Sequence, residues 1–279
     1  YAYTNNNSLT SLLNVAHKAA LALGELKEEK MIDWTKIKNP AIADRVREEG
    51  RFMMQRCHFG VQGIAKTEQD VKLALDRLMQ TGFKPMAFDT EMNFVPMLKE
   101  LTQGEINLHC AVSYPLGRMT LKKKMQDLET LLKMGILDVC VCLDWQAIFS
   151  HRYKDVEREA AAIVKEFDGL FTKNAYVIPA TLLSDTEMAD TLRALDSAGV
   201  YSVKVNPGCK LGVSYEEVEL IKRLFPNRFD IHPSGNIRTL EAFEKYMDLG
   251  CQVIHTASAL DIVETFMKRQ LANYGGIEE

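Results

Sequence analysis

The sequence predicts an α/β fold, a single (β/α)8 TIM barrel with an N-terminal helical extension. Eight short apolar runs alternate with eight amphipathic stretches between residues 53 and 272. Such strict alternation indicates a parallel sheet, and eight units fit a closed barrel better than an open, doubly wound sheet. The length of 279 residues and the hydrophobic content of 47% suit one barrel with a large core.

Each predicted element has a local signal in the sequence. Glycines such as Gly82 and Gly250 follow predicted helices, where a left-handed residue ends a helix. Thr67, Ser184 and Ser214 stand before acidic residues at predicted helix starts and indicate N-caps. The predicted strands are 53–62, 84–89, 106–113, 136–144, 175–181, 200–205, 229–232 and 251–256. The predicted helices are 67–81, 93–103, 120–134, 152–168, 185–198, 215–225, 239–249 and 259–272.

Residues 1–50 lie outside this alternation and form a predicted helical extension, while residues 51–279 form the predicted barrel domain. SLTSLLNVAHKAALALGEL has apolar residues at helical spacing, and DWTKIKNPAIADRVREEG reads as a turn followed by a second short helix. We expect this extension to cover the bottom of the barrel. The alternative is a surface for a partner or for self-association.

Composition excludes several classes of function. The net charge is −4, from 38 acidic and 34 basic residues, which gives no reason to expect nucleic acid or membrane as a partner. No apolar run has the length of a membrane span, and the first residues lack a signal-peptide pattern, so we expect a cytoplasmic protein. The six cysteines form no CxxC pair and the six histidines show no HxH or HxxxH spacing. We therefore expect reduced cysteines, no metal site and no cofactor.

Lys204 is the candidate nucleophile. It lies in the apolar segment YSVKVNPGC, directly before a Pro-Gly turn. Buried lysines are rare unless paired, and burial disfavours the charged amine, so a lysine here suits Schiff-base chemistry. The alternative is an ordinary lysine whose amine reaches water at the strand end. Strand alternation places Ser202 and Lys204 on one face, and polar residues near the carboxyl ends of barrel strands favour a catalytic role.

The same alternation sorts two further strands. It places Asp138, Cys140 and Cys142 together on one face of the strand at 136–144. It likewise places Asp230 and His232 on one face of the strand at 229–232. The lumen of the barrel is therefore predicted to be polar.

A phosphate site is predicted where the last three strands end. Barrels commonly bind phosphate with the loops after strands seven and eight and with a helix N-terminus. Gly208 and Gly235 allow close backbone approach, Asn236 follows in PSGNIRT, and Ser258 offers a hydroxyl where the last helix begins. Each residue alone fits an ordinary turn or cap, whereas their joint placement favours a phosphate site.

These motifs, in this order, resemble the deoxyribose-phosphate aldolase family. VKVNPGC followed by SGNIRTLEAFEKYMDLGCQVIHTASALDIVE is similar to the family's VKTSTGF, GGIRT and GTSSG patterns. VSYPLGRMT and GILDVCVCLDWQAIFSHRY extend the resemblance over residues 55–265. It implies a lyase of deoxyribonucleotide catabolism that needs no cofactor. The implied reaction is reversible Schiff-base cleavage of 2-deoxyribose 5-phosphate, a small phosphorylated sugar, to glyceraldehyde 3-phosphate and acetaldehyde.

The resemblance assigns roles residue by residue. It identifies Lys204 with the Schiff-base lysine, and it places His232 at a second lysine and Cys140 at an aspartate that works in proton transfer. The phosphate motif falls on Gly208, Gly235, Asn236 and Ser258, with Asn236 where the family has glycine.

Two hypotheses follow from these departures. The first is an aldolase-like enzyme, monomeric or homodimeric, whose activity is impaired because Cys140 and His232 replace the proton relay; positioned proton transfer is worth about 10²–10⁴-fold. The second is a catalytically inactive barrel that serves as a binding or scaffolding protein, for example on the cytoskeleton, with a protein partner. Retention of Lys204 favours the first and the altered relay favours the second.

Overall fold

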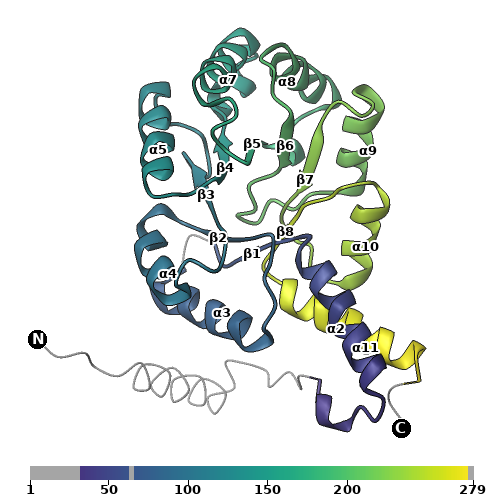
Figure 1. Ribbon diagram of the computed structural model, residues 1–279. Helices are drawn as coiled ribbons and strands as arrows, with labels where there is room; N and C mark the ends of the chain where they lie inside the picture. The colour runs from purple at the N-terminus through teal and green to yellow at the C-terminus, as the bar shows by residue number, and fades with distance from the viewer. Residues whose placement is uncertain (1–31, 63–65, 276–279) are drawn as a thin grey trace, which may run out of the picture.

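The computed structural model describes residues 32–62 and 66–275, in which eight strands alternate with helices (Figure 1). The strands are β1 (Cys57–Gly60), β2 (Ala87–Thr90), β3 (Leu108–Val112), β4 (Asp138–Cys142), β5 (Lys173–Ile178), β6 (Ser202–Val205), β7 (Asp230–Pro233) and β8 (Ile254–Thr256). The helices are α2 (Pro40–Met54), α3 (Glu68–Thr81), α4 (Val95–Thr102), α5 (Leu121–Lys133), α6 (Trp145–Phe149), α7 (Tyr153–Phe167), α8 (Asp185–Ser197), α9 (Tyr215–Leu224), α10 (Leu240–Asp248) and α11 (Ala259–Asn273). Three short 3-10 helices are η1 (Trp34–Lys36), η2 (Met92–Phe94) and η3 (Ala180–Leu182).

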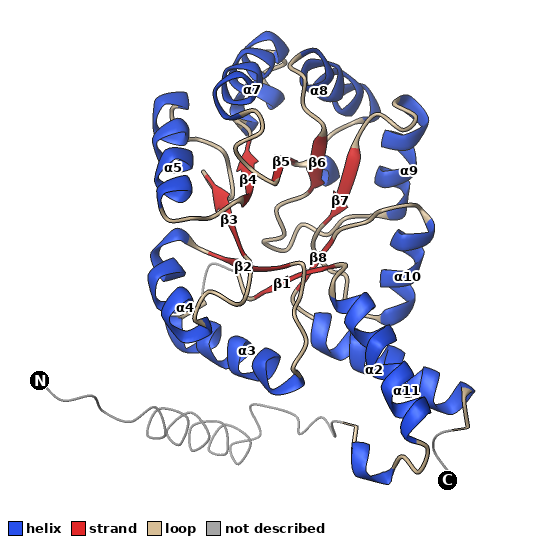
Figure 2. Cartoon of the chain, in the orientation of Figure 1, coloured by secondary structure: helices blue, strands red, loops and turns tan. Residues whose placement is uncertain are grey.

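The strands form a barrel, which confirms the predicted fold class. They pair in parallel in the order β7-β6-β5-β4-β3-β2-β1-β8. The two outermost strands of that order meet at a parallel bridge between Ser234 and His255, which closes the ring. Figure 2 shows the strands surrounded by helices, so one strand face lines the lumen and the other packs on the helices.

The predicted strand boundaries differ from the observed ones where the same apolar residues fit either a helix or a strand. The first strand begins at Cys57 rather than 53, because α2 continues to Met54 and buries both Met53 and Met54. The short helix α6 was not predicted. It begins after Asp144, whose side chain accepts a hydrogen bond from the backbone N–H of Gln146.

The predicted helix ends are confirmed. Thr67, Ser184 and Ser214 each cap a helix, and in each case the acidic residue three positions later completes a capping box. Gly82 and Gly250 have φ values of +67° and +82°, the left-handed conformation in which glycine terminates a helix at least cost.

The described part of the N-terminal extension packs along the last helix. A Cβ atom on Gly50 of α2 would lie 2.5 Å from Met267 Sδ on α11, so the two helices approach closely at this glycine and a larger residue would displace the Met267 side chain. Glu49 accepts hydrogen bonds from Gln270 and Tyr274 at 2.8 and 2.7 Å. Helix α2 runs across residue 50, and the division of the chain there stays a prediction. The helix expected within residues 8–26 lies outside the described residues.

Apolar side chains occupy two separate regions. The main core lies between the strands and the helices. A smaller group lies apart from it and consists of Cys140, Cys142, Ala175 and Val177, from β4 and β5. Part of the lumen is therefore apolar. Among the helices that the structure describes, none has the length and apolar character needed to cross a membrane.

Candidate active site

Lys204 and His232 are neighbours across β6 and β7. The register pairs Lys204 with His232 and Ser202 with Asp230, so the two predicted residues face the same side of the sheet. Lys204 is 2% exposed, and among the described residues no carboxylate lies within ion-pairing distance of its amine. The contrast with the other buried lysine is direct, because Lys124 is ion-paired with Glu159. Lys204 is thus a buried amine that no salt bridge from the described part of the chain holds.

His232 forms a pair with Asp230. Its Nε2 lies 2.9 Å from Asp230 Oδ2, a distance at which the imidazole donates and the carboxylate accepts. Burial lowers the pKa of His232 from its usual value, Asp230 opposes this change, and the nearby charges of His58 and Lys173 add to it. The ring is therefore neutral near pH 7, and with Nε2 protonated its Nδ1 carries a lone pair. Sequence reasoning placed Asp230 on this face but gave it no role.

Cys140 faces the lumen, as predicted, but its thiol contacts a histidine. Cys140 Sγ lies 3.3 Å from Nε2 of His109, and the Nδ1 atom of that ring lies 2.7 Å from Asp138 Oδ1. The side chain is buried among Cys142, Ala175 and Val177. The described contacts of Cys140 thus link it to β3, on the opposite side of β4 from β6.

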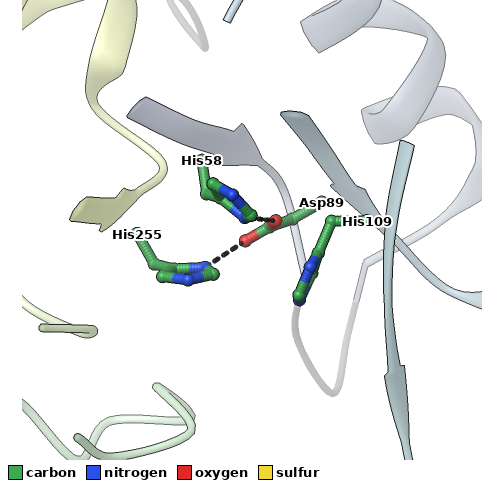
Figure 3. A group of neighbouring side chains, drawn as sticks. All are labelled: His58, Asp89, His109 and His255. Carbon is green, nitrogen blue, oxygen red and sulfur yellow. Dashed lines mark hydrogen bonds and ion pairs between the residues drawn. The ribbon is translucent and has the colours of Figure 1, made fainter. Parts of the chain in front are cut away.

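A cluster of histidines and aspartates fills another part of the lumen. Figure 3 shows His58 and His255 directed at the two oxygens of Asp89, with Nδ1 to oxygen distances of 3.2 and 3.0 Å, and His109 beside them. Nε2 of His58 also lies 3.3 Å from Asp138 Oδ2. The three imidazoles and two carboxylates are each at most 7% exposed. No local sequence pattern signals this group, because its residues come from β1, β2, β3, β4 and β8.

Opposite charges hold this cluster together. Burial opposes ionisation of Asp89, yet its interactions with the neighbouring imidazoles of His255, His109 and His58 outweigh burial and hold the pKa of Asp89 well below its usual value. Burial also opposes charge on His109, and the electrostatic influence of the neighbouring Asp89 and Asp138 carboxylates outweighs burial and raises the pKa of His109 to about 10. Burial and the nearby Lys204 and His58 side chains lower the pKa of His255, and they outweigh the opposing effect of Asp89. The pKa of His255 therefore lies well below its usual value.

The structure brings Gly208 and Gly235 together. A Cβ atom on Gly235 would lie 2.3 Å from the carbonyl oxygen of Leu211 and 3.3 Å from the Cα of Gly208. Both glycines have left-handed φ values, +86° and +88°. The loops after β6 and β7 therefore touch through backbone atoms, and only glycine fits at position 235.

Asn236 and Ser258 lie on the loops after β7 and β8. Asn236 has a φ of +60° and packs against Gly212, where an added Cβ atom would lie 2.4 Å from Asn236 Nδ2. Ser258 precedes α11, and its side chain makes no capping hydrogen bond. The hydroxyl of Thr256 donates to the Ile237 carbonyl and accepts from the Ser258 N–H, which ties these two loops together.

The loop that follows Lys204 is conformationally unusual. Asn206, Cys209 and Lys210 have φ values of +67°, +51° and +70°. Non-glycine residues in this region are uncommon and concentrate at functional sites. Asn206 is held in place by Thr181, whose hydroxyl accepts from Asn206 Nδ2 at 2.7 Å. The Tyr114 hydroxyl reaches this loop from the end of β3 and lies 2.9 Å from Cys209 Sγ.

Known proteins similar to this chain are aldolases. The chain is 24% identical over 200 residues to a deoxyribose-phosphate aldolase of Staphylococcus haemolyticus, which covers 71% of this chain and 89% of that relative. It is 26% identical over 168 residues to a deoxyribose-phosphate aldolase of Aquifex aeolicus, covering 60% and 76% of the two chains. No protein-family model matches the chain.

A solved structure agrees on the architecture. The deoxyribose-phosphate aldolase from Aeropyrum pernix, described as a unique tetramer, superposes with a TM-score of 0.67 at 22% identity, over 80% of this chain and 97% of that one. At that identity the likeness concerns the fold alone. Fold and sequence similarity point to the same group of proteins.

Proposed function

We propose that this chain, a divergent member of the deoxyribose-phosphate aldolase family, is a Schiff-base aldolase acting on a small phosphorylated sugar, with 2-deoxyribose 5-phosphate as the first candidate. One observation carries the proposal. Lys204 is buried directly beside the His232–Asp230 pair, and no carboxylate in the described part of the chain pairs with its amine. The similarity to curated aldolases supports aldolase-like function. The same similarity does not support the alternative of a non-catalytic scaffold, and it does not support impaired turnover.

Lys204 would act as the nucleophile. Its neutral amine attacks the C1 aldehyde of the sugar, and loss of water leaves a protonated Schiff base. The C2–C3 bond then breaks, its electrons enter the Schiff base to form an enamine, and the C3 hydroxyl loses its proton as glyceraldehyde 3-phosphate leaves. Protonation of the enamine at C2 and hydrolysis release acetaldehyde and return Lys204 to its starting state.

His232 would move the proton in these steps. Its neutral Nδ1 accepts the C3 hydroxyl proton, either directly or through one water, and returns it to C2 of the enamine. Asp230 binds Nε2–H at 2.9 Å, which fixes the tautomer and stabilises the transient imidazolium. A histidine–carboxylate pair would thus perform the work that the family resemblance assigns to a lysine and an aspartate.

The phosphate would bind above this pair. Gly208 and Gly235 bring two loop backbones into contact, and backbone N–H groups in such a turn can point at an anion. Asn236 lies next to them, and the hydroxyl of Ser258 is not used as a helix cap. The N-terminus of α11 adds its dipole, which favours a dianionic group.

A trapping experiment tests the proposal. The protein is incubated with 2-deoxyribose 5-phosphate and sodium borohydride, which reduces a Schiff base to a stable amine, and peptides are mapped by mass spectrometry. We expect an adduct on Lys204 and none on Lys124, a buried lysine held by Glu159 that serves as an internal control. A coupled assay for glyceraldehyde 3-phosphate measures turnover. Folded protein without an adduct on Lys204 would exclude this substrate and this nucleophile.

A further inference from the structure

The histidine cluster beside the proposed catalytic pair has the composition of a metal site, and its His255 ring lies 5.8 Å, centroid to centroid, from the ring of His232. His58, Asp89, His109 and His255 come from four strands that are consecutive around the ring, β8, β1, β2 and β3. One nitrogen or oxygen atom from each of the four lies within 4.8 Å of the others (Figure 3). We infer that these four side chains bind one divalent transition-metal ion, with zinc as the first candidate.

The imidazoles are not satisfied by the protein alone. Within residues 32–62 and 66–275, Nε2 of His255 has no hydrogen-bond partner, and Nε2 of His58 lies near Asp138 without the alignment of a hydrogen bond. A buried polar atom without a partner costs about 1–3 kcal/mol, and such atoms are rare in native structures. Two of them on adjacent rings indicate a ligand that bonds to nitrogen lone pairs.

The buried charges also suit a dication. Asp89 and Asp138 bring two carboxylates into the lumen, at 7% and 2% exposure. A divalent ion would neutralise both while leaving the imidazoles neutral, which is the form that binds metals. Asp138 contacts His109 Nδ1 at 2.7 Å, so it takes the place of the outer carboxylate that orients a metal-binding histidine.

The ligand types and spacing select the class of metal. Three imidazoles and one carboxylate suit zinc and its neighbours in the first transition row, whereas magnesium and calcium prefer oxygen ligands. Ligand atoms of a tetrahedral zinc site with bonds of about 2.1 Å lie about 3.4 Å apart. The widest separation here is 4.8 Å, so the rings would draw inward by roughly an ångström on binding.

The test counts metal ions on the full chain without substrate, so its result is independent of aldolase activity. Chelator-treated protein receives Zn²⁺ or Co²⁺, excess ion is removed by gel filtration, and bound metal is measured by mass spectrometry. We expect one ion per chain, a cobalt spectrum of four-coordinate nitrogen and oxygen ligands, and a higher melting temperature. Folded wild-type protein that retains less than about a tenth of an equivalent overturns the inference.

Variants locate the ion. His58→Gln and His255→Gln should each weaken binding at least tenfold, and Asp138→Asn should weaken it about 10–100-fold through the outer shell. His151→Gln is the matched control, because His151 also pairs with a carboxylate, Glu187 at 3.0 Å, but on the surface. Equal loss in the control would overturn the assignment. If the inner variants fail to fold, the Asp138→Asn affinity and the wild-type cobalt spectrum decide.

Discussion

Two parts of the barrel lumen differ in how their buried ionisable side chains are paired. Around β6 and β7, Lys204 has no carboxylate partner and the nearby Asp230 is bound to His232. In the cluster on β1, β2, β3, β4 and β8, Asp89 and Asp138 each contact two imidazoles. A buried charge is stable only when it is paired. The amine of Lys204 in the first region is therefore available to react, whereas the side chains of the second region are arranged to bind an ion.

Removing the amine of Lys204 should have the largest effect on activity. Lys204→Met should abolish adduct formation and lower turnover by at least about 10³-fold, because the covalent step loses its nucleophile. It should not lower the free energy of unfolding appreciably, since no ion pair is lost. Borohydride trapping, the coupled assay and urea denaturation measure the three quantities.

The matched control for that variant is Lys124→Met. Removing one partner of the buried Lys124–Glu159 pair should cost about 3–5 kcal/mol of unfolding free energy while leaving the adduct on Lys204 intact. If Lys204→Met still turns over substrate, or if Lys124→Met loses the adduct while folded, the two lysines do not differ in the way described.

Changing the proton carrier should have the next largest effect. His232→Gln should lower turnover by about 10²–10⁴-fold while the adduct on Lys204 still forms, because amine attack does not need the imidazole. Asp230→Asn should cost less, since it disturbs the orientation of the ring without removing it. Single-turnover kinetics separate the two steps. Loss of adduct and turnover in parallel would place His232 in substrate binding instead.

A phosphate-loop variant should act mainly on substrate affinity. Gly235→Ala adds a Cβ atom 2.3 Å from the Leu211 carbonyl oxygen, so the loop must move and KM should rise by about tenfold or more. Gly82→Ala is the control, because Gly82 also has a left-handed φ but has no atom within 4 Å of the added Cβ. It should cost about 1–2 kcal/mol of stability and leave KM unchanged.

The smallest effect is expected at Cys140. Cys140→Ala should change turnover by less than about fivefold, because the described polar contact of its thiol is with His109 on β3 and not with His232 on β7. A loss as large as that of His232→Gln would show that the cysteine carries the proton after all. Comparing the two variants at equal folded concentration decides the point.

Much of the fold was predictable because its signals are local. Alternation with period two placed Lys204 and His232 on the lumen face, and the parallel register then made them neighbours. Capping residues and terminal glycines marked helix ends for the same reason. The strand limits were less accurate, since apolar residues such as Met53 and Met54 serve a buried helix as well as a strand.

The histidine cluster was not predictable from spacing. Sequence patterns such as HxxxH detect ligands carried by one element, whereas His58, His109 and His255 each come from a different strand. Their convergence depends on barrel closure and on the shear between strands, which no local pattern encodes. Asp230 differs, because strand alternation already places it on the same face as His232. Only the hydrogen bond between the two side chains cannot be predicted from the sequence.

The contact between α2 and α11 has a practical consequence for handling the molecule. Arg45 and Glu49 lie against Tyr274 and Gly50 lies against Met267, so the two helices run antiparallel. Helix α11 starts where β8 ends, and α2 finishes just before β1 begins, so the start of α2 and the end of α11 form the outer end of this pair and point away from the strands (Figure 1). A label on an exposed residue near the outer end of this helix pair, such as Asp44 or Ala272, would therefore stand clear of the barrel mouth during kinetic or single-molecule work.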